Sequence, residues 1–410
     1  LLRAHVLALG YSGVRPVVVD RLLRFLNEEV LPLVPEQGSL GASGDLAPLA
    51  HLVLPLIGEG EVAFHGDRMP GWMALERAGL EPIELEPKEG LSLVNGTQGM
   101  LAVGVLAAAR GRALAKLADV AAAMTVEAIL ATDRPFDRRL QELRPHPGQG
   151  ASAANLRTLL DGSAVVRSHA DSAHLVQDAY SLRCAPQVHG AFRDAVAHAV
   201  SVLVTEMGSV TDNPVVLVDD DDVVSGGNFH GQPVAGPLDG VAAAAVSLAS
   251  ISERRLYRLL DPAANNGLPA FLVERPGVNS GFMIVQYTAA SLVSESKARA
   301  HPASIDSIPS SAGQEDHVSM GMTAARHARD SVGNAEVVVA LEALAAAQAL
   351  DLRRPLKPAA GTSAAAAAIS RMIPFLDGDR ELKPDVDAAI ELVQSGTLVA
   401  AAEEAVGPLA

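Results

Sequence analysis

The sequence predicts a mainly α-helical protein, a bundle of long helices with short loop and strand-like excursions. Hydrophobic residues make up 49% of the 410 residues but aromatic residues only 3%. The core is therefore expected to consist of Ala, Val and Leu, a mixture that favours close-packed helices. Several long segments have apolar residues on most faces, as helices inside a bundle do.

The individual helices follow from this pattern. Residues 100–132 contain no proline and two glycines, so they predict one long buried helix. A second helix is expected to begin at Pro186, a favourable first-turn residue, and to end near Gly208. Further helices are predicted over residues 240–260, 281–300, 320–352 and 384–394.

Two short strand-like runs, residues 215–218 and 223–224, flank an acidic cluster at residues 219–222. The cluster is interpreted as a solvated hairpin turn. A calcium loop is the functional alternative, but neither EF-hand spacing nor a following glutamate supports it.

Charge and cysteine content limit the partners. The chain has 32 basic and 48 acidic residues, a net charge of −16, which repels phosphate backbones and acidic leaflets. We therefore expect small-molecule partners, no nucleic acid and no membrane; the apolar stretches also meet polar residues before reaching the length of a span. A single cysteine, Cys184, excludes an internal disulfide and favours a cytoplasmic location.

The glycine-rich run at residues 35–51 is the most unusual segment. It contains neither the GK(S/T) sequence of a P-loop nor the GxGxxG pattern of a dinucleotide-binding fold. The glycine spacing alone therefore favours a turn without a ligand-binding role. Ala42-Ser43-Gly44 offers further chemistry, because in a tight turn the Gly44 nitrogen can attack the Ala42 carbonyl carbon. Loss of two waters, one of them from Ser43, then leaves an imidazolone with an exocyclic methylene. Gly44 has no Cβ to obstruct this approach.

This run resembles the signature of the aromatic amino-acid ammonia-lyases, and most closely their histidine ammonia-lyase branch. The resemblance extends over most of the chain through KEGLSLVNGTQ (88–98), QDAYSLRCAPQVHG (177–190), TDNPVV (211–216), SGGNFHGQPVA (225–235), GVNSGFM (277–283) and SAGQEDHVSM (311–320). It implies one lyase domain over residues 1–410. Residues 1–99 are expected to carry the prosthetic-group loop and residues 100–410 the helical bundle.

The resemblance also implies the chemistry. The family forms 4-methylideneimidazole-5-one (MIO) autocatalytically, here from Ala42, Ser43 and Gly44, and no metal or nucleotide is expected. The implied reaction is the non-oxidative α,β-elimination of ammonia from L-histidine to trans-urocanate, the first step of histidine degradation. A homotetramer is expected, with sites that draw on more than one subunit.

Several site residues are carried over from the resemblance. Asn95 matches the family asparagine beside the electrophile, where its amide can bond the imidazolone or the substrate amine; a turn residue is the alternative. Gln177, Tyr180 and Arg183 recur every third residue, which predicts alignment on one side of a helical turn. Arg183 suits the substrate carboxylate, and Tyr180 and Gln177 are expected to add donors, unless they serve core hydrogen bonds.

Two further residues concern the substrate ring. Phe229 resembles a family aromatic that packs near the ring, although an isolated Phe is more often core. Glu315 indicates histidine, because a carboxylate can pair with an imidazole but gains nothing from a phenyl ring. Asp316 and His317 are predicted to form a structural ion pair.

Other activities remain alternatives. Phenylalanine or tyrosine ammonia-lyases and aminomutases use the same prosthetic group, and an inactive helical fragment is the non-enzyme alternative. The fumarase and aspartase lyases also form long-helix bundles, but their signature is absent.

The family's N-terminal catalytic tyrosine motif does not occur among the four tyrosines of this sequence. The expectation is therefore an N-terminally truncated lyase with severely impaired turnover.

Overall fold

The computed structural model describes residues 1–172 and 176–410, which form two compact units. The first unit contains Leu1–Ala107, His198–Gly240 and Pro302–Arg329, and the second contains Ala108–Ala197, Val241–His301 and Asp330–Ala410. Four long helices contribute residues to both units: α6 (Gln98–Ala128), α11 (Ala185–Met207), α12 (Gln232–Leu260) and α14 (Gly321–Leu352). The expectation of one lyase domain divided at residue 99 stays a prediction.

The predicted helical class and its long helices are confirmed. Besides α6, α11 and α14, helices α13 (Met283–Arg299) and α16 (Lys383–Gln394) lie close to the predicted bounds. Helix α12 begins earlier than predicted, at Gln232, and contains Pro237. Proline and glycine lower helix propensity in this stretch, but full burial of neighbours such as Val234 and Leu238 outweighs it.

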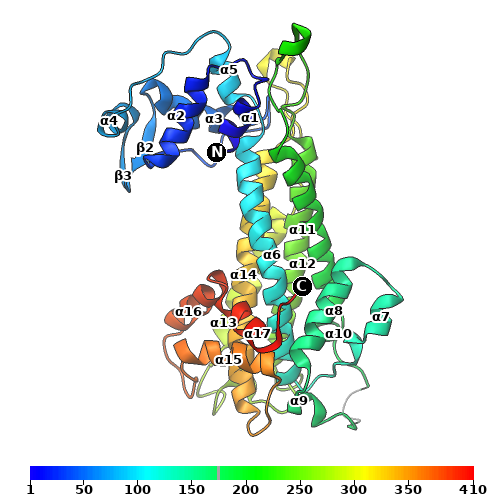
Figure 1. Cartoon of the computed structure of the whole chain (residues 1–410). Helices are drawn as coiled ribbons and strands as arrows, with labels where there is room; N and C mark the ends of the chain where they lie inside the picture. Colours follow the sequence, from blue (N-terminus) through cyan, green and yellow to red (C-terminus); the bar gives the residue numbers. More distant parts are fainter. Residues whose placement is uncertain (173–175) are drawn as a thin grey trace. The chain divides into compact units, whose positions relative to one another are not determined.

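In the second unit, α6, α11, α12, α13 and α14 run side by side (Figure 1). Ala121, Ala122 and Ala345 are fully buried, and such small side chains allow helix axes to approach closely. The other helical elements of this unit are α16, η2 (Arg134–Phe136), α7 (Arg138–Glu142), α8 (Pro147–Leu160), α9 (Ala164–Arg167), α10 (Tyr180–Arg183), η4 (Ala270–Leu272), α15 (Ala360–Met372) and α17 (Thr397–Val406).

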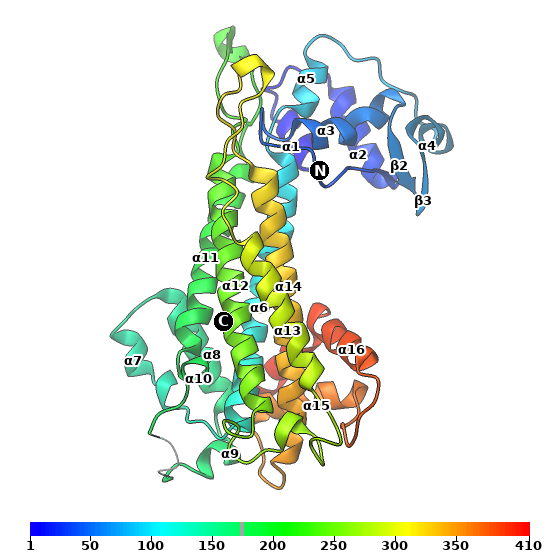
Figure 2. The same cartoon turned by 180° about the vertical axis from the view of Figure 1, so that it is seen from behind.

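The first unit contains a small α/β core that the sequence pattern did not predict. Strands β1 (Val30–Pro32), β2 (Glu61–Phe64) and β3 (Asp67–Pro70) form an antiparallel sheet in the order β1-β2-β3. Helices α1 (Leu2–Ala8), α2 (Pro16–Asn27), α3 (Leu46–Val53), α4 (Gly71–Arg77) and α5 (Glu89–Val94), with η1 (Leu54–Ile57), complete this part (Figure 2).

Helix α2 shows why this core forms. Pro16 occupies its first turn, and Val18, Leu22 and Phe25 recur on one buried face. They pack in one cluster with strand residues such as Val62. The strands are only three or four residues long, so their periodicity is too short to be recognised in the sequence.

The predicted hairpin is confirmed. Strands β4 (Val215–Leu217) and β5 (Asp222–Val224) pair antiparallel, and the aspartates lie at the exposed turn between them, which includes η3 (Val218–Asp220). Among the residues that the structure describes, no group of three or more His, Cys, Asp or Glu side chains is arranged to hold a metal ion.

Helix α12 has the length and apolar composition of a membrane span, alone among the helices in the described part of the chain. Of its most apolar window, 56% is buried inside the protein. A core helix of a bundle has the same composition, so this feature is weak support for a membrane span.

Candidate functional site

The Ala42-Ser43-Gly44 segment forms a tight turn in the first unit, just before α3. Ser43 and Gly44 have φ angles of 49° and 80°, and both lie in the left-handed region. A Cβ on Gly44 would lie 2.1 Å from the Gly96 carbonyl oxygen, so only glycine fits there. The backbone is therefore held in a conformation that most residues avoid.

Hydrogen bonds hold both flanks of this turn. Gly96 donates its N–H to the Ser43 carbonyl at 3.1 Å, and its own carbonyl accepts the Asp45 N–H at 2.8 Å. On the other side, the Leu40 carbonyl accepts the Met320 N–H at 3.0 Å.

The two groups that a ring closure needs lie between these anchors. Within the described residues, the Gly44 N–H donates no hydrogen bond and the Ala42 carbonyl accepts none. No hydrogen bond of these two groups therefore has to break before they react, and the residues present fit an imidazolone formed from this tripeptide.

Glu315 contacts the turn directly. The Ser43 hydroxyl donates to its Oε1 at 3.2 Å, and the Ser310 and Ser311 hydroxyls donate to Oε2 at 2.7 and 2.8 Å. The hydrogen bonds from Ser310 and Ser311, with a smaller effect of Ser43, lower the pKa of Glu315. Glu315 is therefore an ionised acceptor beside Ser43.

Asn95 follows α5 as its C-cap residue and is buried. Its side-chain nitrogen donates to Asp212 Oδ1 at 3.0 Å and to the Asn213 carbonyl at 3.1 Å. Both amide hydrogens are thus engaged, and the Asn95 Oδ1 atom is left as an acceptor. The Asn95 side chain, predicted to serve as a hydrogen-bond donor or acceptor, can therefore act toward a ligand only as an acceptor.

Asp212 and Lys88 are supporting residues that sequence reasoning did not single out. Lys88 donates to Asp212 Oδ2 at 3.0 Å. Burial by itself raises the pKa of Asp212, but hydrogen bonds from Asn95 and Lys88 outweigh it and hold the pKa below its ordinary value. The matched segments 88–98 and 211–216 contain both residues, but only the fold shows that they meet.

Phe229 and His230 lie half-buried in the loop before α12, also in the first unit. The predicted ion pair between Asp316 and His317 is wrong for the part of the chain that the structure describes. The His317 ring instead stacks on the His230 ring, with centroids 5.8 Å apart, and the His317 carbonyl lies 3.2 Å from His230 Nε2. The neighbouring Asp316 side chain is exposed.

Gln177, Tyr180 and Arg183 belong to the second unit. Their predicted alignment on one helical turn is wrong for Gln177, because α10 begins at Tyr180 and Ala179 before it is extended, with φ −62° and ψ 155°, whereas Tyr180 and Arg183 both lie in α10. Gln177 is exposed and precedes the helix. The Arg183 guanidinium carbon lies 4.6 Å from the centre of the Tyr180 ring, and its buried Nε has no hydrogen-bond partner in the described chain.

Known proteins with this fold and these motifs define its class. The family model for aromatic amino acid lyases matches residues 1–371, and the chain belongs to that family. Among its relatives, the histidine ammonia-lyase of Sorangium cellulosum is 57% identical over 100% of this chain and 80% of its own length.

Solved structures agree on the fold. The crystal structure of histidine ammonia-lyase from Trypanosoma cruzi has a TM-score of 0.92 and 44% identity, covering 99% of this chain and 77% of that one. The tyrosine aminomutase of Streptomyces globisporus has a TM-score of 0.93 and 38% identity, covering 100% and 81%. Since a lyase and an aminomutase share this fold, the fold alone does not define the reaction.

Proposed function

We propose that this chain eliminates ammonia from L-histidine to give trans-urocanate, with MIO formed from Ala42, Ser43 and Gly44. The observation that supports it best is the turn itself, in which the Gly44 N–H and Ala42 carbonyl have no hydrogen-bond partner among the described residues while both flanks are held. The 57% identity with a histidine ammonia-lyase favours this reaction over that of the aminomutases. MIO supplies an electrophile that makes the substrate amine a better leaving group.

The chain's own residues then have distinct roles. Asn95 Oδ1 accepts a hydrogen bond from the substrate amine, since its N–H groups are already engaged. The ionised Glu315 accepts a hydrogen bond from the imidazole N–H and favours histidine over phenylalanine or tyrosine. Arg183 binds the carboxylate, with Tyr180, Gln177 and Phe229 as further substrate contacts. A homotetramer in the cytoplasm is part of the proposal, and the lone thiol of Cys184 is consistent with a reducing compartment.

The first experiment measures the intact mass. The wild-type chain is expected to lack two waters relative to its encoded mass, and Ser43→Ala to have the full mass of that variant. Incubation with histidine, tyrosine and phenylalanine, followed by ultraviolet absorbance, then identifies the acrylate formed. An unmodified wild-type mass, or a β-amino acid as the retained product, would contradict the proposal.

A second experiment tests the substrate preference. Glu315→Gln keeps the shape but removes the charge, so the preference for histidine over phenylalanine, as the ratio of kcat/KM, should fall about tenfold or more. Asp316→Asn is the matched control, because Asp316 is the adjacent, exposed acidic residue. An equal loss in both variants would assign the effect to net charge instead.

A further inference from the structure

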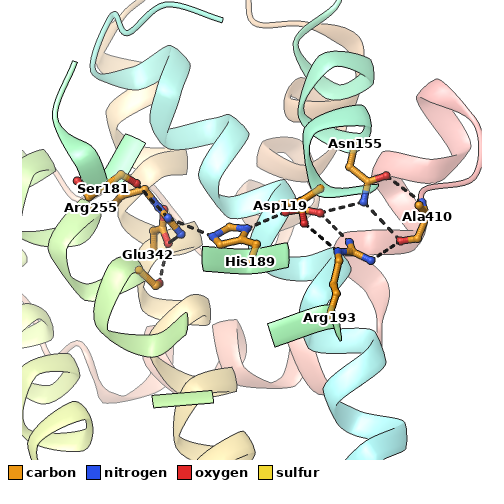
Figure 3. Close-up of polar contacts among 10 residues, drawn as sticks. Asp119, Asn155, Ser181, His189, Arg193, Arg255, Glu342 and Ala410 are labelled. Carbon is orange, nitrogen blue, oxygen red and sulfur yellow. Dashed lines mark hydrogen bonds and ion pairs between the residues drawn. The ribbon is translucent and has the colours of Figure 1, made fainter. Parts of the chain in front are cut away.

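A chain of buried polar side chains crosses the helices of the second unit (Figure 3). Asp119 of α6, His189 of α11, Arg255 of α12 and Glu342 of α14 are all fully buried. Asp119 Oδ1 lies 2.7 Å from His189 Nδ1, and His189 Nε2 lies 3.3 Å from Arg255 Nη1.

Arg255 and Glu342 form the charged centre of this network. Arg255 Nε and Nη2 donate to the two Glu342 carboxylate oxygens at 2.5 and 2.8 Å. The Thr125 and Ser252 hydroxyls donate to the same oxygens at 2.8 and 2.6 Å. A buried ion pair is often no more stabilising than apolar residues of similar volume, so stability alone does not account for this one.

The state of His189 follows from its neighbours. A guanidinium only donates, so His189 Nε2 accepts from Arg255, and a carboxylate only accepts, so Nδ1–H donates to Asp119. His189 is therefore a neutral imidazole that joins a carboxylate to a guanidinium. It engages Arg255 Nη1, whereas Nε and Nη2 engage Glu342, so the two partners together restrict the orientation of the guanidinium.

The remaining contact of Arg255 lies on α10. Its Nη1 donates to the Ser181 carbonyl oxygen at 3.3 Å. Helix α10 has four residues, too few to be stable without tertiary contacts. It carries Tyr180, which is exposed, and Arg183, which stacks on the Tyr180 ring. The position of both side chains therefore depends on what holds the α10 backbone.

We propose that Arg255 is a positioning residue, which holds α10 through the Ser181 carbonyl so that Arg183 can bind the substrate carboxylate. The inference rests on the proposed role of Arg183. Arginine is required because its planar fork serves the two Glu342 oxygens, His189 and Ser181 together, whereas a lysine ammonium cannot.

The test compares two ligands that differ only in the carboxylate. Arg255→Met combined with Glu342→Leu replaces the ion pair by apolar residues of similar size. Calorimetry should show the Kd of trans-urocanate raised about tenfold or more, with the Kd of 4-vinylimidazole unchanged. The mass deficit of two waters should remain, since the variant leaves the 42–44 turn intact.

Two controls separate the possible failures. The double variant Thr125→Val with Ser252→Ala removes two hydrogen bonds to the Glu342 carboxylate but changes no contact of α10. It should therefore lower the Tm and leave both Kd values unchanged. Arg183→Met should reproduce the urocanate-selective loss; if it does not, the proposed role of Arg183 fails rather than the positioning.

The positioning role would be overturned if the Arg255→Met/Glu342→Leu variant bound both ligands equally more weakly. It would also be overturned if that variant bound urocanate normally while Arg183→Met bound it more weakly. If the double variant does not fold, Arg255→Lys retains a charge opposite Glu342 and decides by the same ratio of Kd values.

Discussion

Single residues decide the backbone geometry at the proposed reaction centre. Ser43 has a φ of 49° although it is not glycine, and such residues are held there only where the surrounding structure over-determines them. Gly44 fits next to Gly96 because it has no Cβ, and Gly96 holds the turn through two backbone hydrogen bonds. The strain at this turn is therefore consistent with a segment prepared for a backbone reaction.

Gly44→Ala is expected to abolish ring formation. Its Cβ would lie 2.1 Å from the Gly96 carbonyl oxygen, and its φ of 80° disfavours alanine, so the strand-like pairing of residues 44 and 96 must open. Intact-mass measurement should then show the full encoded mass of the variant.

The matched control is Gly240→Ala, in α12, where nothing lies within 4 Å of an added Cβ. Its mass deficit should equal that of the wild type, with stability equal or higher by up to about 1 kcal/mol. A deficit of two waters in Gly44→Ala would show that the close approach to Gly96 is not required.

At the scale of elements, the long helices predicted from the sequence are present in the structure. Helix α6 has no exposed face over residues 117–128, all of which are buried, among them Leu117, Val120 and Met124. A helix surrounded by other helices needs small residues at contact positions, and the alanine-rich composition provides them.

Two substitutions in α6 test this packing. Ala121→Leu inserts a larger side chain at a position with no exposed area, so the free energy of unfolding should fall by about 1–3 kcal/mol. Ala113→Leu, at an exposed position of the same helix, should change it by less than about 0.5 kcal/mol. Urea unfolding of both variants measures the difference, and equal effects would place Ala121 outside a tightly packed contact.

At the scale of the whole molecule, stability depends on pH through its buried acids. Burial raises the pKa of Asp45 to about 6, against hydrogen bonds from the Met100 N–H and the Ser39 hydroxyl. Hydrogen bonds from Arg15 outweigh burial and lower the pKa of Glu89 to about 2. These two groups therefore act in opposite directions and in different pH ranges.

The raised pKa of Asp45 determines how its contribution to stability changes with pH. Between its unfolded pKa near 4 and its folded pKa near 6, the folded protein binds the proton more tightly, so stability falls as pH rises through this window. The loss is on the order of 3 kcal/mol.

Denaturant unfolding at pH 4 and pH 7 measures this loss. Asp45→Asn should remove the decline across the window, and the acid loss from Glu89, which occurs as pH falls from about 4.5 towards 2, should persist. An unchanged decline in Asp45→Asn would assign it to another group.

By itself, the sequence determined the helical class, the long helices and the Ala42-Ser43-Gly44 tripeptide, because helical periodicity and family motifs are properties of neighbouring residues. It did not reveal the short strands of the first unit, nor that Gln177 lies outside α10, because short elements depend on their packing.

Only the tertiary structure decided which distant groups meet. It brought Glu315 to Ser43, 272 residues earlier in the chain, and engaged both amide hydrogens of Asn95. It also brought Arg255 to the carbonyl of Ser181. Such contacts arise from the packing of segments far apart in the chain, and no local pattern of residues encodes them.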